Sequence, residues 1–220
     1  MKQILALLLA LLMLGLSACG PAAAPSFGDE ASLRGRLEDG VYRNAPLGLE
    51  ITGPAGWRFC GEDRLAQANG LSLSDFRQTD PAVLAERQGQ LTLLMLENEA
   101  KSVLSLSIQP QQRELAGYSD AELFQRLRDS IVENYESVRL SGKQISVQDY
   151  EIRPVLLGGA ERELLHVRLA VTNSRGAVQY YSDEYLIWCR GDESWLGLLT
   201  LATQDGSDPQ PILDAIRAPR

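Results

Sequence analysis

The chain has 220 residues, of which 45% are hydrophobic and 23% charged, as in an ordinary globular protein with one sizeable core. Its 29 acidic residues outnumber the 21 basic ones, so the formal net charge is −8. Because no basic cluster interrupts this balance, the composition argues against a nucleic-acid partner and against electrostatic attraction of the folded domain to anionic lipids.

The first 19 residues predict export. A single early cation, Lys2, precedes an apolar run from Ile4 to Leu16, and small residues close the run at Cys19. This arrangement is typical of a secretory signal peptide, and the run is shorter than the roughly 20 residues that a membrane-spanning helix needs.

The sequence Leu-Ser-Ala-Cys at positions 16–19 resembles a bacterial lipobox. The resemblance implies a lipid on Cys19 and removal of residues 1–18, so that acyl chains supply the membrane contact. Gly20 stands where an Asp would resemble an inner-membrane retention signal. We therefore expect a lipid-anchored protein of the cell membrane or, in a host with two membranes, of the outer membrane, with its domain on the non-cytoplasmic side.

The residues after Cys19 predict a tether. Small residues and prolines fill positions 20–26, and mixed charges without a clear period follow as far as Asp39. Such a stretch has little to bury. We expect a flexible tether over residues 19–40 and a single domain over residues 41–220.

Within that domain, alternating apolar residues predict strands, whereas Asp80-Pro81 and a capping box of Ser119 and Glu122 predict helix starts. The expected strands are 41–42, 47–51, 57–60, 90–97, 102–109, 144–152, 165–171, 179–188 and 195–203. The expected helices are 62–69, 81–88, 120–136 and 209–217. Consecutive strands joined by short turns are antiparallel neighbours, so we expect an α+β fold with a single antiparallel β-sheet flanked by helices.

Residues 40–51, followed by Pro-Ala-Gly-Trp at 54–57, resemble the opening of PsbP-like and Ran-binding Mog-type domains. Their pattern is an aromatic residue, Asn, a small apolar strand and then Pro-x-Gly-Trp, and many bacterial lipoproteins of unknown function open in the same way. The resemblance covers residues 40–217 in element order and residues 40–70 at motif level. It implies an α/β/α sandwich that binds or assembles with proteins, and it carries over no catalytic residue.

Three cysteines are present, and two remain if Cys19 carries a lipid. An exported protein matures where disulfides persist, so we expect a bridge between Cys60 and Cys189. The alternative is a pair of separate buried thiols.

His166 is the single histidine, and we expect it on the polar side of its strand. A zinc site would lack further ligands, and no Gly-x-Ser-x-Gly motif supports a catalytic triad, so a solvated or hydrogen-bonded strand histidine is favoured. Carboxylates on adjacent strands are a second candidate, but they lack calcium-loop spacing. These are Glu161, Glu163, Asp183 and Glu184. We expect no metal and no cofactor.

Tyrosines cluster on one predicted strand. Alternation places Tyr181 and Tyr185 on one face and Tyr180 on the other. One face belongs to the core, and the other is a candidate for presenting aromatic side chains to a partner. Packing under a helix is the favoured interpretation.

Together these features predict a non-catalytic protein-binding or assembly module of the cell envelope, with a protein partner. The alternatives are a small-molecule or lipid-binding lipoprotein and, with less support, a hydrolase that uses His166 or the carboxylates.

Overall fold

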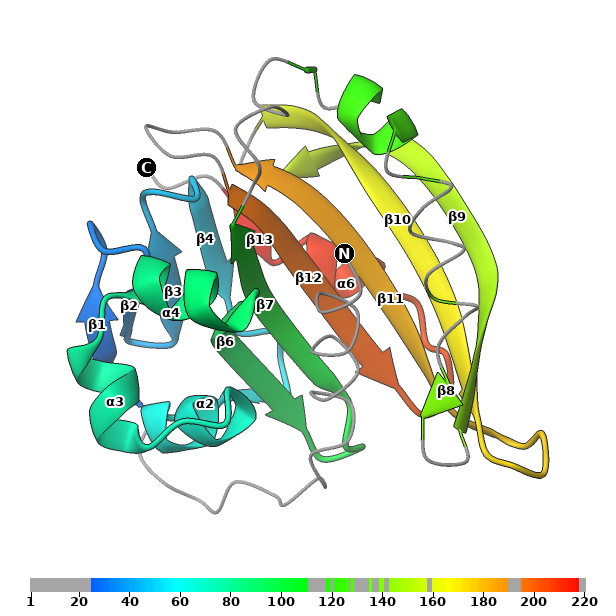
Figure 1. Cartoon of the computed structure of the whole chain (residues 1–220), viewed down its shortest axis with the longest axis horizontal. Coiled ribbons are helices and arrows are strands. Elements are labelled where there is room, and N and C mark those ends of the chain that lie inside the picture. Colours follow the sequence, from blue (N-terminus) through cyan, green and yellow to red (C-terminus); the bar gives the residue numbers. More distant parts are fainter. Residues whose placement is uncertain are drawn as a thin grey trace.

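The computed structural model is mostly β and contains two antiparallel sheets (Figure 1). The predicted single sheet flanked by helices is therefore wrong. The structure describes residues 25–110, 118–119, 121–126, 128, 135, 139–140, 143–157, 160–189 and 195–217, with only the backbone described at a few positions inside the strands and the last helix.

The smaller sheet combines the beginning and the end of the described chain. Its order is β1-β2-β3-β4-β13. Its strands are β1 (Phe27–Asp29), β2 (Gly35–Glu38), β3 (Val41–Asn44), β4 (Leu49–Thr52) and β13 (Ile216–Arg217). Ile216 of β13 lies opposite Ile51 of β4, so the C-terminal strand forms one edge of a sheet whose other strands come from the N-terminal part of the chain.

This sheet corrects two predictions. Residues 27–38 are not tether, because β1 and β2 lie there and bury Phe27 and Leu37. The last helix ends at Leu213 instead of near residue 217, because the chain then joins β4 as a strand. These N-terminal strands are hard to recognise in the sequence because they are only three or four residues long and contain glycines, Gly28 in β1 and Gly35 in β2. A Cβ at Gly28, whose φ is +82°, would lie 2.0 Å from the carbonyl oxygen of Gly35.

The larger sheet has the order β5-β6-β7-β12-β11-β10-β9-β8. Its strands are β5 (Trp57–Phe59), β6 (Leu91–Asn98), β7 (Val103–Pro110), β8 (Arg139–Leu140), β9 (Lys143–Leu157), β10 (Ala160–Thr172), β11 (Val178–Cys189) and β12 (Trp195–Thr203). The predicted hairpin of β6 and β7 and the antiparallel pairing of the later strands are confirmed.

Short helices follow β5 in the chain. They are α2 (Glu62–Ala68), α3 (Leu73–Gln78) and α4 (Pro81–Gln88), and a fourth, α6 (Gln210–Leu213), precedes β13. Helices α2 and α4 contact β6 of the larger sheet. The predicted start of α4 is confirmed, since the Ala82 amide donates to Asp80 Oδ1 at 2.8 Å. The capping box is confirmed as well, with reciprocal bonds between Ser119 and Glu122. Helix α3, capped by Ser72, was not predicted.

The Tyr-x-Asn part of the family-like opening has a structural role. The side chains of Tyr42 and Asn44 are fully buried and bind the backbone of the preceding turn. The Tyr42 hydroxyl donates to the Arg34 carbonyl and Asn44 Nδ2 donates to the Leu33 carbonyl, each at 2.7 Å. Arg34 in turn lies 4.1 Å above the ring of Phe76 and so joins the smaller sheet to α3.

Two hydrophobic cores lie on opposite faces of the larger sheet. One joins that sheet to the smaller sheet and to α2–α4. The other includes Leu123, Phe124 and Tyr135. In the sequence these three residues, with Leu127 and Ile131, fall at helical spacing, which predicts an apolar stripe on the expected helix 120–136. The other two members of the stripe, Leu127 and Ile131, lie outside the described side chains. None of the described helices has both the length and the apolar character that crossing a membrane requires.

The outermost long strand, β9, is irregular along its length. The short strand β8 pairs only with Lys143 and Gln144. On the other side, the register with β10 shifts between Val147 and Asp149, which leaves Gln148 as an extra residue. Pro154 interrupts the row of backbone N–H groups further along the strand.

Candidate functional site

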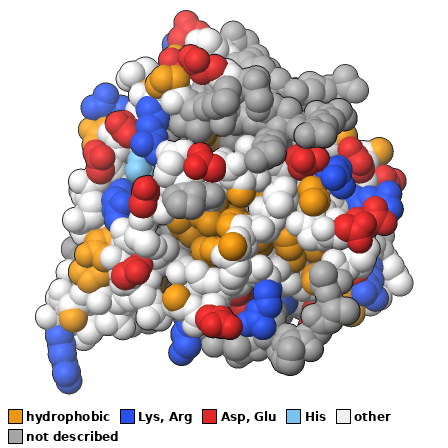
Figure 2. All heavy atoms as spheres, turned by 180° about the vertical axis from the view of Figure 1, so that it is seen from behind, with side chains coloured by type: hydrophobic (Ala, Val, Ile, Leu, Met, Phe, Trp, Pro, Cys, Tyr) orange, Lys and Arg blue, Asp and Glu red, His pale blue; other side chains and the backbone are white. Residues whose placement is uncertain are grey.

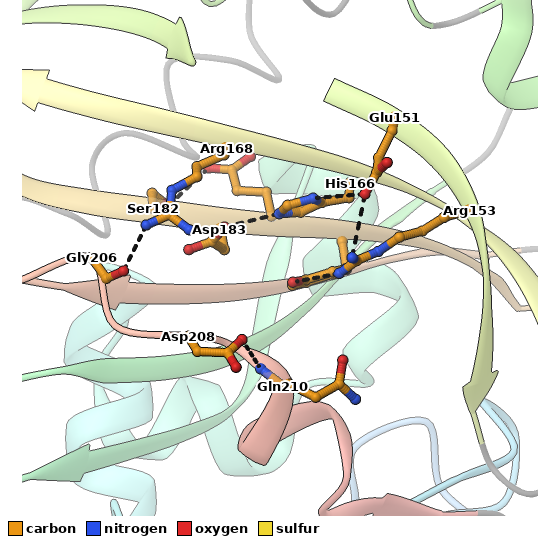
Figure 3. A network of polar contacts seen from close by, with 11 residues as sticks. Glu151, Arg153, His166, Arg168, Ser182, Asp183, Gly206, Asp208 and Gln210 are labelled. Atoms are coloured by element: carbon orange, nitrogen blue, oxygen red, sulfur yellow. Dashed lines mark hydrogen bonds and ion pairs between the residues drawn. The ribbon is translucent and has the colours of Figure 1, made fainter. Parts of the chain in front are cut away.

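Polar side chains from three neighbouring strands meet on one face of the larger sheet. The register places His166 on β10 opposite Glu151 of β9 and Tyr185 of β11, and it places Arg168 opposite Asp183. Figure 3 shows these groups converging. We refer to the following residues as the polar cluster: Glu151, Arg153, His166, Arg168, Asp183 and Tyr185.

The centre of the polar cluster is a buried pair. His166 Nε2 lies 2.9 Å from Asp183 Oδ1, and the two side chains are 7% and 0% exposed. Arg168 lies over the same carboxylate, with Nη1 3.6 Å from Asp183 Oδ1. A fully buried carboxylate is expensive without partners, and here an imidazole and a guanidinium compensate it.

The other imidazole nitrogen faces a second carboxylate. His166 Nδ1 is buried, has no hydrogen-bond partner and lies 4.0 Å from Glu151 Oε1. Arg153 Nη1 lies 3.3 Å from that same oxygen. Glu151 is 46% exposed, so the polar cluster runs from a dry centre at Asp183 to a wet rim on β9.

Tyr185 forms one wall of the polar cluster. Its ring stacks on the imidazole of His166, with centroids 4.6 Å apart and planes inclined by 11°. Arg153 Nη2 donates to the Tyr185 hydroxyl at 3.2 Å. Burial raises the pKa of Tyr185 to about 12, although the positive charge of Arg153 acts in the opposite direction, so the hydroxyl is neutral at physiological pH.

The segment between β12 and α6 contacts the polar cluster at Arg168. Arg168 Nη2 donates to the Gly206 carbonyl at 2.7 Å. Gly206 has φ +69°, and an added Cβ would lie 2.9 Å from both Arg168 and Tyr181. Two residues on, Asp208 Oδ1 accepts a hydrogen bond from the backbone amide of Gln210 at 3.0 Å, at the start of α6 (Figure 3).

A different polar group lies on the opposite face of β11. Glu184 is buried, accepts a hydrogen bond from the Tyr135 hydroxyl and lies 3.5 Å from Ser182 Oγ. Burial raises its pKa to about 7, despite the two hydrogen bonds, which act in the opposite direction. Burial, with a smaller contribution from the Glu184 charge, raises the pKa of Tyr180 to about 12.

The structure corrects the predicted groupings of acids. Asp183 and Glu184 point to opposite faces because they are consecutive residues of one strand. Glu161 and Glu163 are exposed near the start of β10 and join neither group. His166 lies on the polar side of its strand as predicted, and of the two interpretations offered, hydrogen-bonded and solvated, the structure supports the hydrogen-bonded one.

The tyrosines only partly match their prediction. Tyr181 and Tyr185 share a face, as alternation indicated. Tyr185 is 1% exposed, however, so it is not a partner-facing residue. Tyr180 and Tyr181 are half-buried, the first against the core under Leu123 and the second 5.5 Å from the guanidinium of Arg168.

The cysteines lie far apart in the sheet order. Cys19 is outside the described residues. Cys60 is buried directly after β5, and Cys189 ends β11, with β6, β7 and β12 between these two strands. Four steps of about 4.8 Å amount to about 19 Å along a sheet, whereas a disulfide needs Cα atoms within about 7 Å. The sheet order thus weighs against the Cys60–Cys189 bridge, which stays a prediction because the Cys189 side chain lies outside the described part.

Three residues of the polar cluster were not predicted to belong to a site: Glu151, Arg153 and Arg168. Tyr135 was expected on a buried stripe, but its bond to Glu184 was not predicted. The alternation of β10 already placed Arg168 beside His166, so this neighbour was available as a signal. The register with β9 is set by a bulge and a long hairpin, and nothing in the local sequence fixes it.

Seen from behind, the histidine side chain lies between acidic and basic side chains near one margin of the molecule, while hydrophobic side chains gather in the middle (Figure 2). Within the described residues, no three His, Cys, Asp or Glu side chains are placed to hold a metal ion together. The polar cluster is thus a charge network that ties three strands to each other.

A scan against protein-family models and a search of curated proteins found no match to this chain.

Proposed function

We propose that this chain is an exported lipoprotein whose domain binds a protein partner at the surface of the cell envelope, with the lipid on Cys19. The observation that carries the proposal is the lipobox-like sequence at positions 16–19, after a cation and a short apolar run. A single acyl chain holds a protein only weakly, so stable attachment needs two or more chains on this residue.

The start of the fold supports this arrangement. Pro25 lies six residues beyond Cys19, a stretch that spans at most about 21 Å when fully extended. Pro25 also lies beside Gly61, where α2 begins, because an added Cβ at Gly61 would be 4.0 Å from Pro25 Cβ. The lipid would thus hold the α2 end of the domain close to the bilayer, with the strands of the polar cluster on the other side of the molecule (Figure 1).

The chemistry of the polar cluster favours binding over catalysis. The Nε2 atom of His166 is engaged by Asp183, and its Nδ1 atom is buried against Glu151. An imidazole that serves as a general base needs an accessible nitrogen within hydrogen-bond reach of the proton that it removes. We therefore assign His166 to holding strands together rather than to general-base catalysis.

Metabolic labelling with palmitate tests the anchor. The wild-type chain should incorporate the label, and Cys19→Ser should abolish incorporation and release the protein from membranes. Ser17→Ala keeps the small residue that the lipobox pattern needs, so this control should be labelled as the wild type is. Label that persists in Cys19→Ser would overturn the proposal.

Crosslinking in intact cells tests the partner. The anchored protein should give a discrete adduct with another envelope protein, and Cys19→Ser should reduce its yield because the domain is no longer held at the membrane. A single uncrosslinked species at every crosslinker concentration would contradict the protein-binding role and leave the lipid anchor standing.

A further inference from the structure

The two ring nitrogens of His166 are not equivalent in their surroundings. Both face carboxylates, Asp183 at 2.9 Å and Glu151 at 4.0 Å, and both are shielded from water. In a neutral imidazole one nitrogen donates and the other accepts. Since the Asp183 carboxylate can only accept, Nε2 carries the proton in the neutral form, and Nδ1 then directs a lone pair at the carboxylate oxygen of Glu151.

The imidazolium form removes this mismatch, because both nitrogens then donate. A hydrogen bond requires the 4.0 Å separation between Nδ1 and Glu151 Oε1 to shorten by about 1 Å, and a rotation of the half-exposed Glu151 side chain would supply this movement. The chain Asp183–His166–Glu151 would then link β11, β10 and β9 side by side through charge-assisted bonds.

The charged and titratable groups around His166 balance such a cation. They come from all three strands and from the segment before α6, where Asp208 acts electrostatically on Tyr185. The groups are Glu151 and Arg153 on β9, Arg168 on β10, Asp183 and Tyr185 on β11, and Asp208. Two guanidinium groups and three carboxylates are present, so the protonated imidazole makes the numbers of cations and anions equal.

We propose that His166 is a proton-dependent clasp, whose imidazolium form joins the carboxylates of Asp183 and Glu151 and fastens β9 to the rest of the larger sheet. On deprotonation, the Nδ1 proton passes to solvent by way of the half-exposed Glu151 carboxylate, the bond to Glu151 is lost, and the bond from Nε2 to Asp183 remains. The clasp is closed in the imidazolium form and open in the neutral form. This inference does not depend on the lipid at Cys19.

Nitrogen NMR tests the clasp directly. Because His166 is the single histidine, ¹⁵N-histidine labelling of the full chain in detergent gives one imidazole spin system. Between about pH 5 and pH 9, we expect two protonated ring nitrogens at the acid end and an Nε2-protonated neutral ring at the alkaline end. A neutral ring protonated on Nδ1, or a ring that stays neutral throughout, would overturn the proposal.

Hydrogen exchange tests the consequence for β9. Loss of the proton should reduce the protection factors of β9 amides about fivefold, the effect expected from one charge-assisted hydrogen bond to a half-exposed carboxylate. Glu151→Gln should remove this pH dependence, whereas Glu163→Gln, an exposed acid on the same strand as His166, should retain it. Equal pH dependence in all three proteins would overturn the clasp.

Discussion

Asp183 and Glu184 are consecutive residues of β11, yet they are buried on opposite faces of the larger sheet in different chemical surroundings. Asp183 lies between an imidazole and a guanidinium, at 2.9 and 3.6 Å. Glu184 lies in an apolar core with the hydroxyls of Tyr135 and Ser182, and burial raises its pKa to about 7. One face thus compensates a charge with charges, whereas the other favours the uncharged form of the acid.

The largest effect should come from removing the compensated charge. Asp183→Ala leaves His166 and Arg168 without their shared acceptor, so we expect a loss of about 3–5 kcal/mol in the free energy of unfolding, the range for breaking a buried ion pair. Urea denaturation at neutral pH measures this loss.

The matched control for that experiment is Glu163→Ala, which removes an exposed carboxylate from β10 and should change the free energy of unfolding by less than about 0.5 kcal/mol. If the two variants lose similar free energies of unfolding, the Asp183 carboxylate is not a buried charge that His166 and Arg168 stabilise.

On the other face, Glu184→Gln should change the pH dependence of stability. The folded-state pKa of Glu184, about 7, lies above its ordinary value of 4.5, so the folded state binds the proton more tightly. The stability contributed by this group is complete below about pH 4.5 and is lost as the pH rises to about 7. The loss is on the order of 3 kcal/mol, from 1.36 kcal/mol per pKa unit.

The glutamine variant cannot lose a proton. Relative to the wild type, it should therefore be about equally stable at pH 4.5 and more stable at pH 8, by up to that same amount. Glu161→Gln, which changes an exposed acid, should follow the wild type at both pH values. The prediction is contradicted if the free energy of unfolding of the wild type falls no more between pH 4.5 and pH 8 than that of Glu184→Gln. In that case the folded protein stabilises the charged carboxylate.

The smallest effects come from one substitution made on both faces. Tyr135→Phe removes the hydroxyl that donates to Glu184 and should cost about 1–2 kcal/mol, more above pH 7, where the acceptor is charged. Tyr185→Phe keeps the stacking on His166 and loses only the acceptor of Arg153 at 3.2 Å, so it should cost about 0.5 kcal/mol. Unfolding curves of both variants at pH 6 and pH 9 measure these losses in the free energy of unfolding. Equal losses for the two variants at both pH values would contradict the difference between the two faces.

Local chemistry in the sequence predicted single elements well. The alternation of Leu, Ser and Ile gave the β6–β7 hairpin, and the Asp-Pro and Ser-x-x-Glu signals placed two helix starts. Sheet membership was not predictable, because a strand's periodicity does not record its partner. Strands β4 and β5 are separated only by residues 53–56, yet they belong to different sheets.

The same limit applies to the candidate site. Alternation correctly put Tyr181 and Tyr185 on one face, but it carries no information about depth. Tyr185 is buried because His166 covers its ring and Arg153 reaches its hydroxyl, and both contacts depend on pairings made by β9 and β10. The raised pKa of Glu184 likewise depends on an apolar cover that comes from elsewhere in the chain.

The bulge at Gln148 bears on how such a protein behaves when crowded. A long, flat outer strand is a template for adding a strand from another molecule. On β9 the extra residue breaks the regular spacing of backbone groups, Pro154 withholds a donor, and charged side chains such as Glu151 resist stacking. The bulge and the proline therefore make β9 a poorer template for edge-to-edge pairing than a regular strand of the same length.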